Sequence, residues 1–302
     1  MALTLKQLID FYRSDLDSPF QKLRYQVRIK QSRTFDRISE KYGRHQLRGI
    51  KAPTLVYWYK VSGSGGRTAA AYDMIARLRA LFKFGFTLLE DTECKRLAEI
   101  LRESRFGTQG PRLVQLTAEN VQAIRRTARE HFGWYSIALV QAFQFELRLS
   151  QKDVIGEWVP IDEPGSSDFE INGRKWLRGL RWSDIDKNLI LRHATGSSGR
   201  PIEVDLKKAP MVLAELKAIG LDIAALPTSG PIIINDVTGL PWSTTEFRRK
   251  WRLVAKKAGV PDVVKNRDSV PTGTIVGGPD QTPVSQRITL ARIDQSLRRV
   301  RR

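Results

Sequence analysis

The sequence is poor in the residues that build disulfides and metal sites. Its 302 residues include one cysteine, Cys94, and three histidines, His45, His131 and His193. A single cysteine excludes a disulfide framework and any zinc site made of several cysteines, and the scattered histidines lack the spacing of metal ligands. No apolar run approaches the ~18 residues of a membrane span, and the N-terminus lacks the apolar centre of a signal peptide. We therefore expect a soluble, cytoplasmic protein with no membrane contact, no metal and no small-molecule cofactor.

Acidic residues are also scarce relative to basic ones. The chain carries 51 Lys and Arg against 32 Asp and Glu, a formal net charge of +19. Residues 1–105 hold 21 basic and 11 acidic side chains, and the rest of the chain holds 30 and 21. A basic excess on both halves is typical of a protein that closes around nucleic acid, because each phosphate contact releases condensed counterions. Double-stranded DNA is the expected partner, and solubility alone is the alternative explanation of the charge.

Length and composition predict two folded domains. The chain is longer than one ordinary domain, and 41% hydrophobic with 9% aromatic residues is enough to build cores. The stretch RFGTQGPR at 105–112 has two glycines, a proline and no periodicity, as linkers do. We expect a helical, DNA-binding domain at 1–105, a linker at 106–112 and a second domain at 113–302.

The first domain has the pattern of successive helices. The expected ranges are 4–16, 31–43, 52–63, 68–86 and 92–105. In the longest one, three- and four-residue spacing gives one apolar face, made of Tyr72, Ile75, Leu78, Leu81 and Phe82. The cations outside that face are candidate DNA contacts, with a merely solvated face as the alternative: Arg67, Arg77, Arg79 and Lys83.

A glycine-rich loop, VSGSGGRTAA at 61–70, invites a phosphate-loop interpretation but does not fit it. A P-loop requires Gly-Lys-Ser/Thr at its end, whereas Arg67 and Thr68 follow Gly66 here. The dinucleotide pattern would require a third glycine at Thr68 and a preceding strand. We interpret the segment as a flexible loop that leads into a helix.

The second domain begins with helices and then changes character. Helices are expected at 116–130, where Thr117 is the N-cap, and at 134–156, a long apolar segment broken only late. Two short strands joined by a Gly/Ser turn are expected within 177–206, and a third strand at 230–236. Ser243 can cap a last helix that ends at Gly259. The sequence contains no internal repeats.

The order of these motifs resembles the catalytic domain of the tyrosine recombinase, or phage integrase, family. The motifs are FELR at 145–148, LRWSDID at 180–186, RPIEVDL at 200–206 and TGLPWSTTEFRRKWRLVAKKAGVP at 238–261. Residues 1–105 resemble, more loosely, the family's helical core-binding (SAM-like) domain. The resemblance implies a mostly helical α+β fold with a small antiparallel sheet in the catalytic domain. It also implies a DNA-binding protein of site-specific recombination or integration, as found in mobile genetic elements.

Recombinases of this family attack a DNA phosphodiester with a tyrosine hydroxyl. Two arginines, a lysine on a hairpin and His-type donors neutralise the phosphorane and protonate the leaving oxygen. Arg148 matches the first arginine and is the one catalytic residue that the resemblance assigns. Arg192 and Arg200 lie near the hairpin turn and are candidate DNA contacts. A guanidinium with a pKa above ~12 is a poor general acid, so neither replaces the lysine.

Two phosphate-site positions depart from the family pattern. The hairpin lysine should fall near Ser197, but no lysine lies between residues 187 and 207. The register places the second arginine at Val270, with Arg267 and Arg287 as displaced candidates. The resemblance therefore predicts a site without its proton donor and without one of its two phosphate clamps.

The nucleophile position departs as well. In the C-terminal segment, Leu290 stands in the place of a histidine and Arg299 in that of the tyrosine. All seven tyrosines precede residue 136: Tyr12, Tyr25, Tyr42, Tyr57, Tyr59, Tyr72 and Tyr135. No residue of this chain can then be assigned the covalent step, and a second copy of the chain would lack it too.

Three functions compete at this point. The first is a recombinase-like pseudoenzyme that binds DNA in the nucleoid without cleaving it, as a homo-oligomer or beside an active recombinase. The second is a working recombinase with displaced residues, for which Tyr135 would have to enter the site. The third is a basic helical scaffold or interaction protein with no role on DNA.

Overall fold

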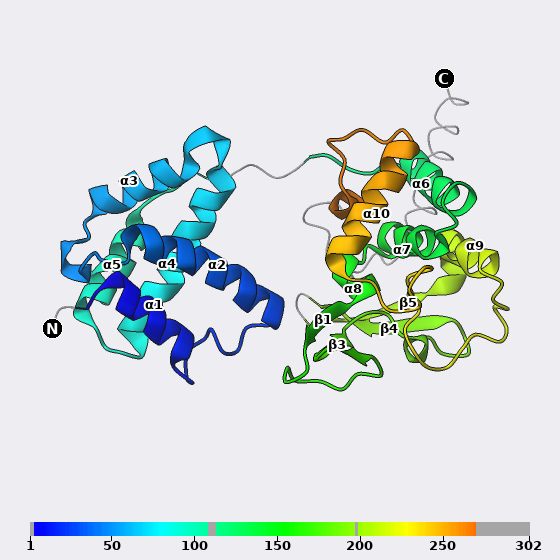
Figure 1. Cartoon of the computed structure of the whole chain (residues 1–302), viewed down its shortest axis with the longest axis horizontal. Coiled ribbons are helices and arrows are strands. Elements are labelled where there is room, and N and C mark those ends of the chain that lie inside the picture. The colour runs from blue at the N-terminus through cyan, green and yellow to red at the C-terminus, as the bar shows by residue number, and fades with distance from the viewer. Residues whose placement is uncertain (1–2, 108–112, 197–198, 270–302) are drawn as a thin grey trace, which may run out of the picture. The chain divides into compact units, whose positions relative to one another are not determined.

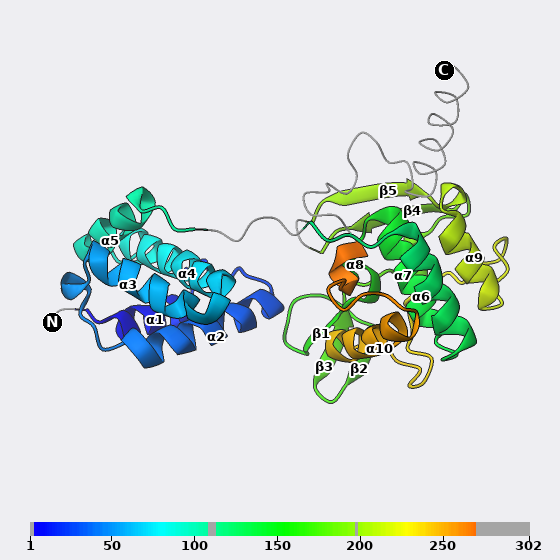
Figure 2. The same cartoon turned by 90° about the horizontal axis from the view of Figure 1, so that it is seen from above.

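The computed structural model describes residues 3–107, 113–196 and 199–269 (Figures 1 and 2). The chain forms two compact units, residues 1–111 and 112–302. Residues 108–112 of the predicted linker lie outside the described residues. In the part of the chain that is described, no helix is long and apolar enough to cross a bilayer.

Five helices build the first unit: α1 (Leu5–Ser14), α2 (Tyr25–Tyr42), α3 (Ala52–Gly63), α4 (Thr68–Thr87) and α5 (Thr92–Glu103). Single 3-10 turns, η1 (Leu47–Gly49) and η2 (Ser64–Gly66), precede α3 and α4. All five predicted helices are present, and α2 begins six residues earlier than predicted. The predicted apolar face of α4 is largely correct, because Ile75, Leu78, Leu81 and Phe82 are fully buried. Tyr72 is the exception and is 38% exposed.

Helix α4 is the centre of the first unit and packs against each of the other four helices. Its closest neighbour is α5, where Gly85 faces Cys94 so closely that an added Cβ would overlap the sulfur. The Cys94 thiol is buried, and burial together with the nearby Asp91 carboxylate raises its pKa. Cys94 is therefore a packing residue rather than a reactive thiol.

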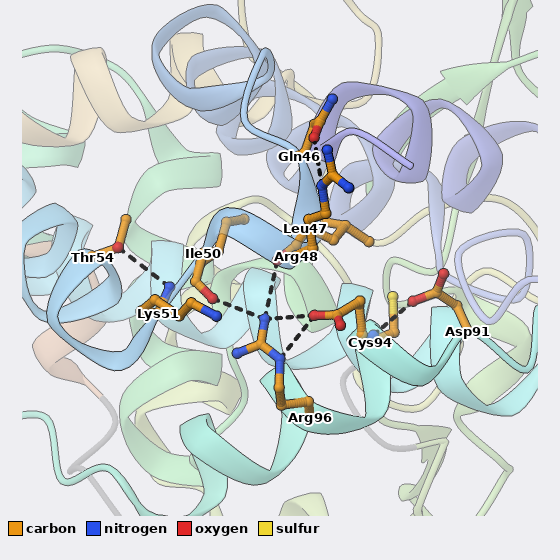
Figure 3. Close-up of polar contacts among 10 residues, drawn as sticks. Gln46, Leu47, Arg48, Ile50, Lys51, Thr54, Asp91, Cys94 and Arg96 are labelled. Carbon is orange, nitrogen blue, oxygen red and sulfur yellow. Dashed lines mark hydrogen bonds and ion pairs between the residues drawn. The ribbon is translucent and has the colours of Figure 1, made fainter. Parts of the chain in front are cut away.

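Arg96 of α5 joins that helix to the turn before α3 (Figure 3). Its Nη2 donates to the carbonyl oxygens of Leu47 at 3.1 Å and Ile50 at 2.9 Å, and it pairs with Glu93 at 2.7 Å. The Leu47 carbonyl also accepts from the backbone N–H of Ile50, so Arg96 adds a second bond to the end of η1. One guanidinium thus satisfies a buried backbone turn and fixes the entry into α3.

Helices and short strands alternate in the second unit. The helices are α6 (Ala118–Glu130), α7 (Tyr135–Leu147), α8 (Gln151–Ile155), α9 (Pro210–Ala218) and α10 (Thr244–Lys257). The strands are β1 (Glu157–Pro160), β2 (Glu170–Ile171), β3 (Arg174–Leu177), β4 (Ile190–Ala194) and β5 (Pro201–Asp205). The 3-10 turns are η3 (Trp182–Asp184), η4 (Leu206–Lys208) and η5 (Asn266–Ser269). The predicted class, α+β and mostly helical with a small antiparallel sheet, is confirmed.

Helix α7 is buried from Ser136 to Leu147 and forms the axis of this unit. It packs against α6 and α9, and Figure 1 shows it among the helices of the second unit. Trp251 of α10 also reaches it, because its Nε1 donates to Oε1 of Gln141 at 2.8 Å. A helix buried on all sides explains why its sequence is apolar without a polar face.

Buried charge holds α9 against α6. Glu215 of α9 is fully buried, and its Oε1 accepts a hydrogen bond from Arg125 at 2.6 Å and a second from Arg129. Glu146 of α7 accepts from the backbone N–H of Val212 at 3.1 Å. Because α9 starts with Pro210, this carboxylate satisfies one of its first free amides.

Two antiparallel sheets complete the second unit. The predicted hairpin is confirmed as β4 paired with β5, with His193 opposite Ile202. The other sheet has the strand order β1-β3-β2 and was not predicted from the sequence. Its longest pairing places Trp158 opposite Trp176.

Two predicted elements differ in the structure. The strand at 230–236 is wrong: Pro231 forms only an isolated bridge with Arg181, and the chain then turns at Asn235, whose N–H donates to the Leu240 carbonyl. Backbone bonds join Trp182 to the Gly230 carbonyl and Ile232 to the Leu180 carbonyl, but Pro231 has no N–H to donate and no ladder develops. The helix predicted at 134–156 is two helices, because Arg148 adopts a left-handed conformation with φ 60° and Ser150 caps a new helix.

Candidate nucleic-acid interface

Cationic side chains surround a cavity of about 520 Å³ in the second unit. Its lining comes from the end of α7, the start of α8, α10 and the segment leading into η5. The lining residues are Gln144, Ser150, Gln151, Lys152, Arg248, Trp251, Arg252, Lys265, Asn266 and Arg267. Half of these ten are Lys or Arg and none is acidic, so the lining favours an anionic ligand.

Three of the five cations have no carboxylate partner among the described residues. Arg248 donates to Oε1 of Gln151 at 3.0 Å, and Lys265 donates to the Asp262 carbonyl at 2.6 Å. Arg267 is exposed and has no polar partner in the described part of the chain. The charges of Arg248, Lys265 and Arg267 are therefore not neutralised by carboxylates.

The other two cations form ion pairs. Lys152 pairs with Glu157 at 3.0 Å, and Arg252 pairs with Asp262. Arg252 also donates to the Val264 carbonyl at 2.9 Å, so it anchors the segment that leads into η5. Because both side chains are paired with carboxylates, they line the cavity without adding unneutralised charge.

Amide side chains of α7 fix η5 at the inner end of the cavity. The Nδ2 of Asn266 donates to Oε1 of Gln144 at 2.8 Å, and Nε2 of Gln141 donates to Oγ of Ser269 at 3.0 Å. Both glutamines are fully buried. Among the described residues, Nε2 of Gln144 and Oδ1 of Asn266 have no hydrogen-bond partner. A buried donor and a buried acceptor thus lie in the lining without partners, which calls for an explanation.

Arg148, the predicted catalytic residue, ends α7 one helical turn after Gln144. It is half-buried and is not itself part of the cavity lining, although Ser150 two residues later is. Its left-handed conformation, φ 60° and ψ 26°, costs a non-glycine residue about 1–2 kcal/mol. Four other non-glycine residues of the described chain share a positive φ, namely Glu90, Asn172, Arg178 and Leu189, so the conformation marks the end of α7 and does not by itself mark a functional position.

The tip of the β4–β5 hairpin lies beside α8. The backbone N–H of Gly196 donates to Oδ1 of Asp153, which follows the cavity residue Lys152. The expected lysine position, Ser197, is outside the described residues. The structure thus brings the end of the described hairpin segment close to the helix that helps line the cavity.

The hairpin cation Arg192 is held by two carboxylates. It pairs with Asp186 at 2.7 Å and with Glu203 at 2.9 Å. The hydrogen bond from Arg192 lowers the pKa of the Asp186 carboxyl, so this carboxylate stays ionised and the pair stays charged. Arg200, the other predicted hairpin cation, is exposed directly before β5. The two carboxylates make Arg192 a weak candidate for a phosphate contact.

The four predicted cations of the first unit do not form one cluster. Arg79 donates to the carbonyls of Leu101 at 3.0 Å and Ser104 at 3.3 Å, where it satisfies the end of α5. Arg77 lies 3.8 Å from Asp73 and only 21% of its side chain is exposed. Arg67 and Lys83 are exposed but stand 16 positions apart, about 24 Å along a helix. The geometry favours a structural role for Arg79.

A basic stripe on α2 is the feature that sequence reasoning missed. Its members are Lys30, Arg33, Arg37 and Lys41, all exposed and spaced three or four residues apart. We call this set the α2 stripe. A cavity of about 130 Å³ between α2 and α4 is lined by Arg37, Lys41 and the predicted Arg67, among others. The three- and four-residue spacing that marks the apolar face at 68–86 also marks this stripe in the sequence.

Metal chemistry has no candidate among the described residues, which contain no group of three or more His, Cys, Asp or Glu side chains able to hold an ion. The Nδ1 atom of His193 lies 3.2 Å from Oδ2 of Asp184. The chemistry that the described side chains offer is anion binding by guanidinium and ammonium groups.

Comparisons with known proteins identify the fold of the chain. No family model and no curated protein matches the sequence. A lambda integrase (75-356) dimer bound to a COC′ core site matches with a TM-score of 0.65, covering 88% of this chain and 84% of that one at 14% identity. A lambda integrase tetramer bound to a Holliday junction matches with a TM-score of 0.63 over 86% of this chain and 65% of that one, at 16% identity. The chain therefore has the tyrosine recombinase fold, as its motifs predicted.

Proposed function

We propose that this protein binds double-stranded DNA in site-specific recombination or integration and does not itself cleave it. The observation that carries the proposal is the cavity whose cations Arg248, Lys265 and Arg267 have no carboxylate partner among the described residues. It is supported by the fold, which is shared with lambda integrase structures bound to a core site and a Holliday junction. Unpaired cations around a concave surface are what a phosphate backbone requires.

Arg148 is proposed to retain its phosphate contact. A guanidinium forms two parallel hydrogen bonds with phosphate oxygens and never loses its charge. The place of Arg148 at the end of α7, one turn from the cavity residue Gln144, supports this role. In the first unit, Arg67 and the α2 stripe are proposed to contact the backbone of the same duplex.

The absence of cleavage is proposed because no side chain can supply the nucleophile. No tyrosine follows Tyr135 in the sequence. Tyr135 starts α7 and Arg148 ends it, and thirteen residues of helix separate their Cα atoms by about 20 Å. A nucleophile must lie within roughly 3–3.5 Å of the phosphorus in an in-line position. Within one chain, Tyr135 therefore lies too far from Arg148 to attack a phosphate that Arg148 holds.

An active recombinase is the proposed partner if strand exchange occurs. A homo-oligomer would repeat the missing nucleophile in each copy, since no copy has a tyrosine after residue 135. We propose that the chain accompanies chromosomal or element DNA in the cell, and that it acts there as the DNA-binding member of a mixed assembly.

Two assays test the proposal together. Titration of the full chain against a duplex by fluorescence anisotropy should show binding that weakens steeply with salt. A nicked suicide substrate resolved on a denaturing gel should show no covalent adduct. No binding even at low salt would support the scaffold alternative, and an adduct lost in Tyr135→Phe would show a displaced active site.

A further inference from the structure

Arg248, an exposed cation of the cavity in the second unit, is held at one end of its guanidinium only. It lies near the start of α10, and its Nε donates to Oε1 of Gln151 at 3.0 Å. Its two Nη groups have no hydrogen-bond partner among the described residues. One side of this guanidinium is thus fixed, while the two terminal donors remain available to a ligand.

Gln151, which accepts that bond, is itself fixed in orientation. It is half-buried at the start of α8, and its Nε2 donates a long hydrogen bond of 3.5 Å to the carbonyl oxygen of Thr244 in α10. The reverse orientation of the amide would set its NH₂ group against the Nε–H of Arg248, donor against donor. Both bonds therefore require the oxygen of Gln151 to face Arg248.

A neutral amide orients a guanidinium without neutralising its charge. Arg252, one turn further along α10, is held instead by the carboxylate of Asp262, which cancels its charge. Gln151 offers Arg248 an acceptor but no negative charge, so Arg248 keeps its full attraction for an anion. A guanidinium held in this way can form two parallel hydrogen bonds with phosphate oxygens, and it loses less rotamer freedom on binding than a mobile one.

We propose that Gln151 is a positioning residue for DNA binding, which holds Arg248 so that its two Nη groups bind one backbone phosphate. The inference rests on the DNA binding proposed above. Gln151 acts through Arg248 and makes no contact of its own with the phosphate. Its contribution to affinity must therefore disappear when Arg248 is absent.

Two substitutions of Gln151 separate orientation from charge. Gln151→Met keeps the side-chain length and removes both polar atoms. Anisotropy titration of the full chain against a labelled duplex should show binding roughly 2- to 10-fold weaker than in the wild type, because Arg248 must then be ordered on binding. The slope of log K against log salt should not change, since no charge is lost. Gln151→Glu pairs Arg248 with a carboxylate and should reduce that slope by about 0.9.

A double-mutant cycle distinguishes positioning from a structural role of Gln151. In an Arg248→Met background, Gln151→Met should change the affinity by less than about twofold. The matched control is an Arg249→Met background, which removes the neighbouring exposed cation and should leave the effect of Gln151→Met complete. A complete effect in both backgrounds would overturn the inference, because Gln151 would then act through α8 and not through Arg248. Wild-type affinity of Arg248→Met would overturn it as well.

Stability is measured beside affinity, by urea denaturation of each variant. If Gln151→Met does not fold, the salt slope of Gln151→Glu decides the question, and an unchanged slope overturns the inference. In each of these outcomes the wild-type chain still binds the duplex, so the proposed function stands. No binding of the wild-type chain at low salt would refute the proposed function and this inference together.

Discussion

Arg148 shows how one residue can serve two demands. Its left-handed backbone ends α7, a place where glycine is common because it has no Cβ to clash. An arginine there gives up about 1–2 kcal/mol of backbone stability. The sequence motif offers one reason for an arginine at this strained position, which is the phosphate contact proposed for its side chain.

Substitution of Arg148 should separate stability from binding. Arg148→Ala should weaken DNA binding by roughly 1–3 kcal/mol, the range for a lost charge-assisted contact. Arg148→Lys should recover only part, because an ammonium cannot form the planar fork. Arg148→Gly should weaken DNA binding as much as Arg148→Ala does. Its free energy of unfolding should be about 1 kcal/mol higher than that of Arg148→Ala, because glycine adopts a φ of 60° without strain. Anisotropy and urea denaturation measure the two effects, and equal stability of Gly and Ala would contradict the strain.

Glu215 is the residue on which the α6–α9 contact depends. Glu215→Gln should lower the free energy of unfolding by about 3 kcal/mol, because the nearly buried Arg125 would lose its counterion. Glu203→Gln is the control, since its pair with Arg192 is exposed and should cost under about 1 kcal/mol. Chemical denaturation of both variants measures this. Similar costs for the two would show that burial does not govern these pairs.

At the scale of elements, the α4–α5 contact is set by a missing side chain. Gly85→Ala should destabilise the first unit by about 1–3 kcal/mol, because the new Cβ would meet Cys94 Sγ and also Cδ1 of Leu8 at 3.0 Å. Cys94→Ala in the same chain should restore part of the loss. Gly49→Ala is the control, as nothing lies within 4 Å of its added Cβ. Thermal unfolding compares them, and no difference between Gly85→Ala and Gly49→Ala would contradict the close packing.

Helices were predictable because their signals are local. Thr117 and Ser243 cap α6 and α10 as predicted, each accepting from a backbone N–H three residues on. Strands β1 to β3 were missed because they are only two to four residues long. The turn between β2 and β3 did carry a signal, since Asn172 and Gly173 both have positive φ and Asn-Gly is typical of two-residue hairpin turns. Tertiary pairing, rather than propensity, decides such short strands.

The candidate site was only partly predictable for a related reason. Arg148 and the hairpin follow from motifs that are contiguous in the sequence. The cavity joins Gln144 to Asn266, 122 positions apart, and no local spacing connects them. The α2 stripe, by contrast, is a local pattern that could have been found.

At the scale of the whole molecule, a net charge of +19 is shared by both units. Many acidic side chains are already committed to ion pairs, as Asp36 is to Arg13 and Asp168 to Arg181. The cations of the α2 stripe include Arg33 and Lys41, for which the described residues provide no carboxylate partner. Arg33 and Lys41 are both exposed, so their charges are accessible to a polyanion.

The salt dependence of the DNA-binding constant measures how many of these charges contact phosphate groups. The double variant Arg33→Gln/Lys41→Gln should reduce the slope of log K against log salt by about 2, close to 0.9 for each lost contact. Arg102→Gln, an exposed cation paired with Glu103 on α5, should leave the slope unchanged. An unchanged slope in the double variant would remove the α2 stripe from the interface.

The hydrogen bond from the Gly196 N–H to Asp153 joins two segments that lie 43 positions apart in the sequence. It holds the end of the described β4 segment against α8, whose residues Gln151 and Lys152 line the cavity. A change in the hairpin would therefore be transmitted to the cavity wall through a single backbone contact, and the two parts of the second unit should respond together.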